Sequence, residues 1–157
     1  MLNISIMKTL VLGYGNTLRS DDGAGYRLAE IVEAWQLPDV EAWATNQLLP
    51  EMAATLVAFD LVIFVDATAF PDETVELTCR PLTAEIQTLR THYLEPATLL
   101  ALAQQLYARQ PQAYWLLISA ENFAFGEQFS ARTQAGIGRA LEKIVELAGL
   151  VPELVHA

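Results

Sequence analysis

The stretch from Leu10 to Tyr26, LVLGYGNTLRSDDGAGY, places the strongest constraint on how this chain can fold. Its apolar run ends at Gly13 and Gly15, and glycine suits a tight turn because it adopts positive φ and allows close backbone approach. A short polar loop then leads to Asp21 and Asp22, and the apolar residues that follow are spaced for one face of a helix. The stretch predicts a strand, a tight turn and a helix with an acidic entrance.

The two aspartates favour a cation over a phosphate in this turn. The loop after a strand of an α/β protein commonly binds phosphate at the start of the next helix. Asp21 and Asp22 occupy that position and would repel a pyrophosphate. The dinucleotide fingerprint also requires a third glycine three residues after Gly15, where this chain has Leu18. A structural alternative stays open, in which the glycines shape the turn and Asp21 caps the helix.

Apolar patterns predict strands that alternate with helices along the chain. The expected strands cover residues 8–13, 40–45, 61–65, 75–80 and 114–119. The expected helices cover residues 23–36, a segment starting at 50, 95–109 and 130–148. This alternation predicts a three-layer α/β/α sandwich with a mostly parallel sheet of about five strands. The length fits a single domain over residues 1–157, with a loose tail at 149–157.

Composition excludes several classes of function. The net charge of −10 opposes binding to nucleic acid, which depends on clustered basic residues. The apolar runs are too short to span a membrane, and the first residues read as a strand rather than a signal peptide, so we expect a cytoplasmic protein. Cys79 is the only cysteine, which excludes an intramolecular disulfide and a zinc site built on several thiolates.

Three polar side chains are candidates for a metal site. Asp66 follows a buried apolar run, and the loops at 16–22, 66–70 and 120–122 are expected to open at the same edge of the sheet. Asp22, Asp66 and His92 would together offer two carboxylates and an imidazole, a set that suits Zn²⁺, Ni²⁺, Co²⁺ or Fe²⁺. The alternatives are an Asx turn at Asp66 and a solvated loop position for His92.

The run GYGNTLRSDDGAG resembles the GxGNxLxxDDGxG signature of the hydrogenase maturation endopeptidases. The segment FVDAT, which contains Asp66, resembles the second acidic position of that family. The loop with His92, before a helix that begins with proline, resembles the histidine position of the family. The similarity extends over about residues 8–148, and the first motif is quite specific.

This resemblance implies a substrate and a site. Members of the family remove a C-terminal extension from the large-subunit precursor of nickel-iron hydrogenases after nickel insertion, and the nickel in the precursor is the recognition signal. Asp22, Asp66 and His92 match the positions that contact nickel. Asp22 or Asp66 would help a water molecule attack, and the nickel would come with the precursor rather than be held tightly by the protease. We expect a monomer, with substrate contacts from Gly15, Asn16, Gln47 and Glu121.

One region departs from the family pattern. Members often carry a glycine-containing element such as Asp-Gly-Gly after the second strand, whereas this chain reads ATNQLLPE. That form looks more like the branch serving bidirectional, NAD-linked hydrogenases, and it leaves the roles of Asn46 and Gln47 open. Two other classes of function stay as alternatives: a Rossmann-like small-molecule or nucleotide-binding enzyme, and a non-catalytic nickel-sensing chaperone that binds the precursor without cutting it.

Overall fold

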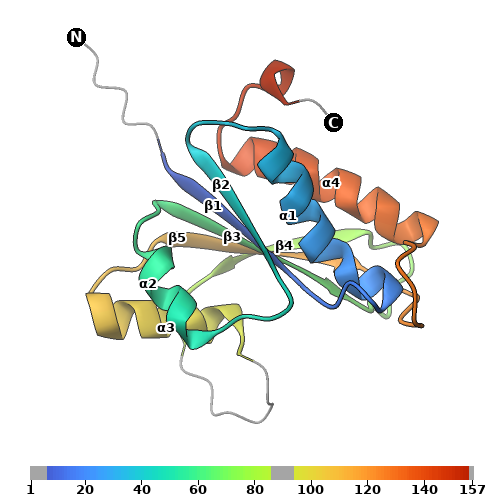
Figure 1. Ribbon diagram of the computed structural model, residues 1–157, viewed down its shortest axis with the longest axis horizontal. Coiled ribbons are helices and arrows are strands. Elements are labelled where there is room, and N and C mark those ends of the chain that lie inside the picture. The colour runs from blue at the N-terminus through green and yellow to red at the C-terminus, as the bar shows by residue number, and fades with distance from the viewer. Residues whose placement is uncertain (1–6, 86–93, 156–157) are drawn as a thin grey trace.

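The computed structural model describes residues 7–85 and 94–155 of the chain (Figure 1). The strands of these residues are β1 Thr9–Tyr14, β2 Val40–Thr45, β3 Leu61–Thr68, β4 Leu77–Leu82 and β5 Gln112–Ser119. The α-helices are α1 Ala24–Ala34, α2 Ala53–Leu56, α3 Pro96–Tyr107 and α4 Ala131–Leu147. Short 3-10 turns occur at η1 Ser20–Gly23, η2 Pro50–Met52 and η3 Pro152–Leu154.

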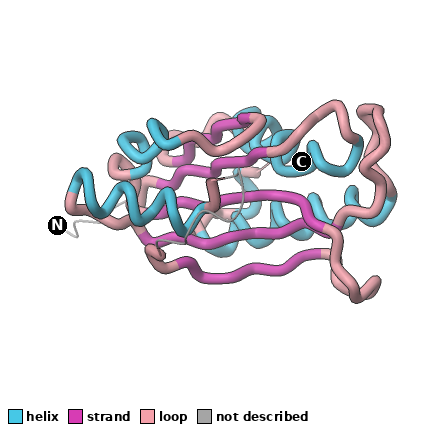
Figure 2. The backbone as a smooth tube through the Cα atoms, turned by 90° about the horizontal axis from the view of Figure 1, so that it is seen from below, coloured by secondary structure: helices cyan, strands magenta, loops and turns pink. Residues whose placement is uncertain are grey.

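The strands form one sheet in the order β2-β1-β3-β5-β4. The pairs β1–β2, β1–β3 and β3–β5 are parallel, and β4 runs antiparallel to β5 at one edge. Helices cover both faces of the sheet (Figure 2), with α1 and α4 on one face and α2 and α3 on the other (Figure 1). The predicted three-layer α/β/α sandwich with a mostly parallel, five-stranded sheet is confirmed.

The central strands β1 and β3 are buried on both faces, which explains their continuous apolar sequences. Alternate side chains of each strand enter two separate apolar cores. The core under α1 and α4 receives Val11, Ile63, Val65, Leu116 and Ile118. The core under α2 and α3 receives Leu10, Leu12, Val62, Phe64, Leu99 and Leu100. Asp66 lies an even number of residues after Phe64, so its side chain is on the α2/α3 face.

Several element boundaries differ from the predicted ones, among them these three. The helix expected from residue 23 is preceded by η1, so both aspartates lie in a 3-10 turn that leads into the helix rather than in an irregular loop. Strand β3 continues to Thr68, which places Asp66 within the strand. The helix expected after Pro50 is short, consisting of η2 and the four residues of α2. None of the helices in the described ranges is long and apolar enough to cross a membrane.

Helix α1 begins in direct backbone contact with the sheet. A Cβ atom on Gly13 would lie 1.9 Å from the carbonyl oxygen of Gly25, and one on Gly25 would lie 2.3 Å from the carbonyl oxygen of Val65. No side chain fits at either position, because both neighbours are backbone atoms of buried elements. The two glycines therefore set the height of α1 above β1 and β3, and with it the position of η1.

We predict that Gly13→Ala lowers the free energy of unfolding by about 3 kcal/mol or more, because the added methyl group would force α1 away from the sheet. The matched control is Gly138→Ala in α4, where an added Cβ would meet no atom within 4 Å. That control is expected to raise stability by about 0.5–1 kcal/mol, since alanine is the better helix former. Urea unfolding of the two variants measures both changes, and equal effects would contradict this packing.

Candidate active site

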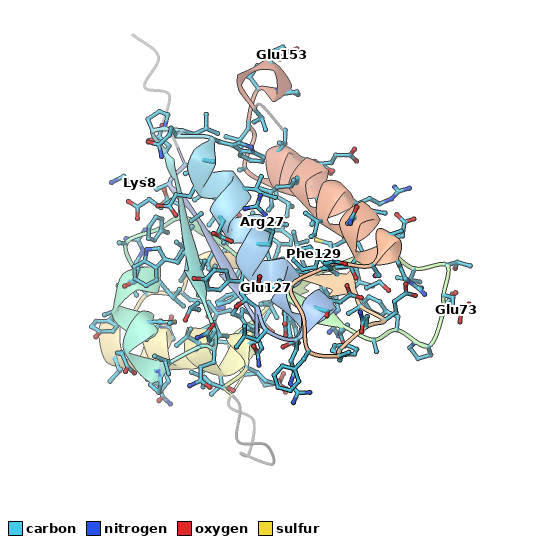
Figure 3. The ribbon with its side chains drawn as sticks, turned by 45° about the vertical axis from the view of Figure 1, so that its right-hand side comes forward. Lys8, Arg27, Glu73, Glu127, Phe129 and Glu153 are labelled. Carbon is cyan, nitrogen blue, oxygen red and sulfur yellow. The ribbon has the colours of Figure 1, made fainter. Side chains whose placement is uncertain are left out.

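Two loops that follow parallel strands are fastened together at the carboxyl edge of the sheet. The loop from β1 to α1 and the loop from β5 to α4 form an isolated bridge between Arg19 and Gly126. The amide of Ser20 donates to the carbonyl of Gly126 at 2.8 Å, and the amide of Gly126 donates to the carbonyl of Leu18 at 3.0 Å. In Figure 3, the β5–α4 loop, marked by Glu127 and Phe129, runs beside the start of α1. The predicted convergence of these two loops is therefore seen in the structure.

Asp21 is the centre of this attachment. Its side chain is fully buried. One carboxylate oxygen, Oδ1, accepts from the amide of Ser130 at 2.8 Å. The other, Oδ2, accepts from the amides of Glu121 and Asn122 and from the hydroxyl of Ser130, at 2.8–3.0 Å. Burial is the largest influence on the pKa of Asp21 and raises it, but these hydrogen bonds together lower the pKa below its usual value. Asp21 neither caps the helix nor faces a cleft, so it is a structural residue.

Asp22, the next residue of η1, is half-buried, and its side chain contacts the glycine loop rather than the β5–α4 loop. Its Oδ2 accepts from the backbone amide of Asn16 at 3.0 Å. Gly15 makes this contact possible, because its φ of +150° suits only glycine and a Cβ there would lie 2.0 Å from the carbonyl oxygen of Asp22. The glycine loop thus folds back onto η1. One carboxylate oxygen of Asp22 is used in this contact, and no hydrogen bond within the described part of the chain uses the other.

Asp66 lies on the third-last position of β3, near Asp22. Its Oδ1 accepts from the amide of Ala67 at 2.7 Å. Burial raises the pKa of Asp66 to about 7, and the negative charge of Asp22 adds to this increase, while hydrogen bonds from Ala67 and from the Tyr14 hydroxyl partly offset it. Two carboxyl groups therefore share one small region, and the more buried of them holds a proton close to neutral pH.

Tyr14 is a member of this region that the sequence analysis did not single out. It is the last residue of β1, on the same face as Asp66, and its side chain is largely buried. Burial and the nearby charge of Asp66 raise the pKa of Tyr14 well above its usual value, so the phenol stays protonated and can donate. A polar aromatic residue at the end of an otherwise aliphatic strand was the available sequence signal.

The carboxylate pair lacks a neutralising cation among the described residues. The salt bridges found there involve other acidic groups, namely Glu30, Asp60, Glu76 and Glu146. No group of three metal-binding side chains forms within residues 7–85 and 94–155. His92, the expected third ligand, lies outside the described residues, so the three-ligand set stays a prediction.

The four residues that we expected to contact the substrate differ in exposure and in hydrogen bonding. Gly15 is buried, and Asn16 shapes the turn because its Oδ1 accepts from the amide of Leu18 at 2.9 Å. Gln47 is exposed after β2, and its carbonyl accepts from the hydroxyl of Thr45. Glu121 has an exposed side chain and a backbone amide that is held by Asp21. The side chains of Gln47 and Glu121 are thus free to reach a ligand, whereas Gly15 and the Asn16 side chain build the loop.

We predict that Asp21→Asn lowers the free energy of unfolding by about 3 kcal/mol. Both carboxylate oxygens of Asp21 accept hydrogen bonds, so in either orientation the new NH₂ group would face a hydrogen-bond donor. Asp22→Asn is the matched control, and it can keep its single hydrogen bond from Asn16, so a loss below about 1 kcal/mol is expected. Chemical denaturation at pH 7 compares the two. Since the pKa of Asp21 is lowered in the folded state, its contribution is present at neutral pH and declines as the pH falls below about 4.

A second prediction concerns pH. The raised pKa of Asp66 means that the folded state retains a proton that the unfolded state releases, so this group reduces stability as the pH rises from about 4 to about 7. Asp66→Asn should therefore be more stable than the parent protein at pH 8, by about 1–3 kcal/mol, with a smaller difference at pH 5. Thermal unfolding at both pH values tests this, with Asp39→Asn as control. A stability difference that is independent of pH would contradict the raised pKa.

Similarity to known proteins was found in solved structures. No family model matches the chain, and no curated protein does. The [NiFe] hydrogenase maturation protease HycI from Thermococcus kodakarensis superposes with a TM-score of 0.71 at 23% identity, over 93% of this chain and 95% of that one. The hydrogenase maturating endopeptidase HybD from E. coli superposes with a TM-score of 0.70 at 23% identity, over 90% and 91%. This chain therefore has the fold of those two proteins along nearly its whole length.

Proposed function

We propose that this protein is a hydrogenase maturation endopeptidase, which removes the C-terminal extension of a nickel-iron hydrogenase large-subunit precursor once nickel has been inserted. The observation that carries the proposal is the pair formed by Asp22 and Asp66 at the carboxyl edge of the sheet. Support also comes from the signature-like run GYGNTLRSDDGAG, which builds that edge, and from the fold shared with maturation endopeptidases.

The donor chemistry of the pair fits a divalent transition metal. Carboxylate oxygens bind such ions, and nickel accepts oxygen and imidazole ligands. A cation between Asp22 and Asp66 would remove the repulsion that helps to keep Asp66 protonated, so binding would release a proton near neutral pH. In the proposal His92 completes the set, and the nickel arrives as part of the precursor, whose own ligands fill the remaining positions.

Each residue of the pair then has a defined task. Asp22 is held by the amide of Asn16 through one oxygen, which leaves its second oxygen to contact nickel or orient a water molecule. Asp66 is partly buried and close to the Tyr14 hydroxyl, so it can accept or return a proton at neutral pH. Together they support an aspartate-based, metal-assisted hydrolysis in which nickel positions the peptide near the scissile bond.

A nucleotide-binding enzyme is the less favoured alternative. A phosphate at the start of the helix would need the free backbone amides of the glycine loop. The Asn16 amide is already used by Asp22, and the Asp21 amide donates to the carbonyl of Asn122. Two carboxylates beside these positions would also repel phosphate, so the observed hydrogen bonds favour a cation.

We predict that mixing the protein with nickel-loaded precursor shortens the precursor by its C-terminal extension, whereas nickel-free precursor stays intact. Asp22→Asn and Asp66→Asn should each slow the cleavage by about 100-fold or more, because they remove an ionisable oxygen ligand from the site. Intact-mass spectrometry over a time course measures the products.

Asp39→Asn is the matched control, since Asp39 precedes β2 at the opposite end of the sheet, and it should cleave at the parental rate. Binding of the precursor without any loss of mass would identify a nickel-sensing chaperone and overturn the peptidase proposal. Equal cleavage of nickel-free and nickel-loaded precursor would overturn the nickel-recognition part alone.

A further inference from the structure

Three apolar side chains are exposed on the two fastened loops next to the carboxylate pair. Leu18 lies between Asn16 and η1, while Phe123 and Phe125 lie in the β5–α4 loop. The Phe125 side chain is 82% exposed. Exposed aromatic rings are costly in water and are enriched at protein interfaces. We refer to Leu18, Arg19, Phe123 and Phe125 as the aromatic rim.

Hydrogen bonds hold the backbone of the rim in place, although its apolar side chains are exposed. The bridge between Arg19 and Gly126 is reinforced by the Ser20 hydroxyl, which donates to the carbonyl of Ala124 at 2.8 Å. The Arg19 guanidinium lies 5.4 Å from the centroid of the Phe125 ring, close enough for a cation–π contact. The backbone beside the ring is therefore held in place and the cation–π contact favours one position of the ring, which reduces the conformational entropy that a partner would remove on binding.

The rim lies on the loop that carries Asp22 and on the β5–α4 loop that is attached to it. Leu18 is four residues from Asp22 in the sequence. Its carbonyl accepts a hydrogen bond from the amide of Gly126, the residue after Phe125. Asn122, next to Phe123, is held by Asp21, which adjoins Asp22. A polypeptide that reaches Asp22 and Asp66 therefore comes close to these apolar side chains.

We propose that the aromatic rim is a docking surface for the protein substrate, and that it determines substrate affinity rather than the rate of bond cleavage. This inference rests on the proposed function, because it takes the hydrogenase precursor as the occupant. A second copy of this chain is disfavoured, since a buried aromatic side chain contributes only about 150–250 Å² and a stable dimer needs about 1,200 Å² or more. An anionic membrane is disfavoured by the net charge of −10.

The test compares Phe125→Ser with Leu106→Ser. Leu106 is 65% exposed near the end of α3, which leads to the start of β5 and hence to the opposite edge of the sheet. Both substitutions remove an exposed apolar side chain, so both variants are expected to unfold at the parental temperature. The steady-state kinetics of precursor cleavage are measured by intact-mass spectrometry, and precursor binding is measured by biolayer interferometry.

Phe125→Ser should raise KM and weaken precursor binding about tenfold with an unchanged kcat, whereas Leu106→Ser should change neither. Parental cleavage and binding by Phe125→Ser would overturn the docking surface while leaving the proposed function intact. If the parent protein does not cleave the precursor and Phe125→Ser still weakens precursor binding, the peptidase proposal is overturned and the docking surface is supported. A Phe125-dependent dimer in analytical ultracentrifugation, or Phe125-dependent binding to phosphatidylserine vesicles, would replace the proposed occupant and overturn the inference.

Discussion

The contact on which the rest of the structure depends is the approach of helix α1 to strands β1 and β3 through Gly13 and Gly25. Backbone meets backbone there, with no room for a Cβ atom on either residue. Because α1 starts so close to the sheet, the η1 turn in front of it lies over the carboxyl ends of the strands. This position brings Asp22 near Asp66 and carries Asp21 into the β5–α4 loop. The positions of the two aspartates therefore depend on the close packing at Gly13 and Gly25.

The adjacent aspartates have opposite environments because η1 turns their side chains in different directions. Asp21 is fully buried and accepts four hydrogen bonds, and its pKa is lowered because donors surround it. Asp22 accepts one hydrogen bond and contributes its charge to the site. The first residue holds two loops together and the second is available to a ligand. Two adjacent aspartates at a helix entrance can therefore differ, one holding loops together and the other remaining open to a ligand.

The sequence predicted the layers of the fold well, because β1 and β3 are continuous apolar runs and the helices have clear apolar faces. It also predicted that the loops after β1 and β5 open at the same edge of the sheet, but not that they bond to each other. The resemblance assigned the nickel-contacting position to Asp22, but the residues alone could not show what Asp21 does, since its role arises from long-range hydrogen bonds to Glu121, Asn122 and Ser130. Tyr14 was missed because its relevance depends on the strand order, which places β1 beside β3. His92 lies outside the described residues, so its part in the site rests on the resemblance.

We propose above all that Asp22 and Asp66 together bind a divalent metal ion. Anomalous diffraction at the nickel absorption edge, from crystals of the protein equilibrated with Ni²⁺ at pH 8, tests this most directly. We expect one strong anomalous peak within bonding distance of a carboxylate oxygen of both residues, and its loss in crystals of Asp22→Asn. A peak bound to only one of the two carboxylates, or nickel bound only elsewhere on the surface, would contradict the account.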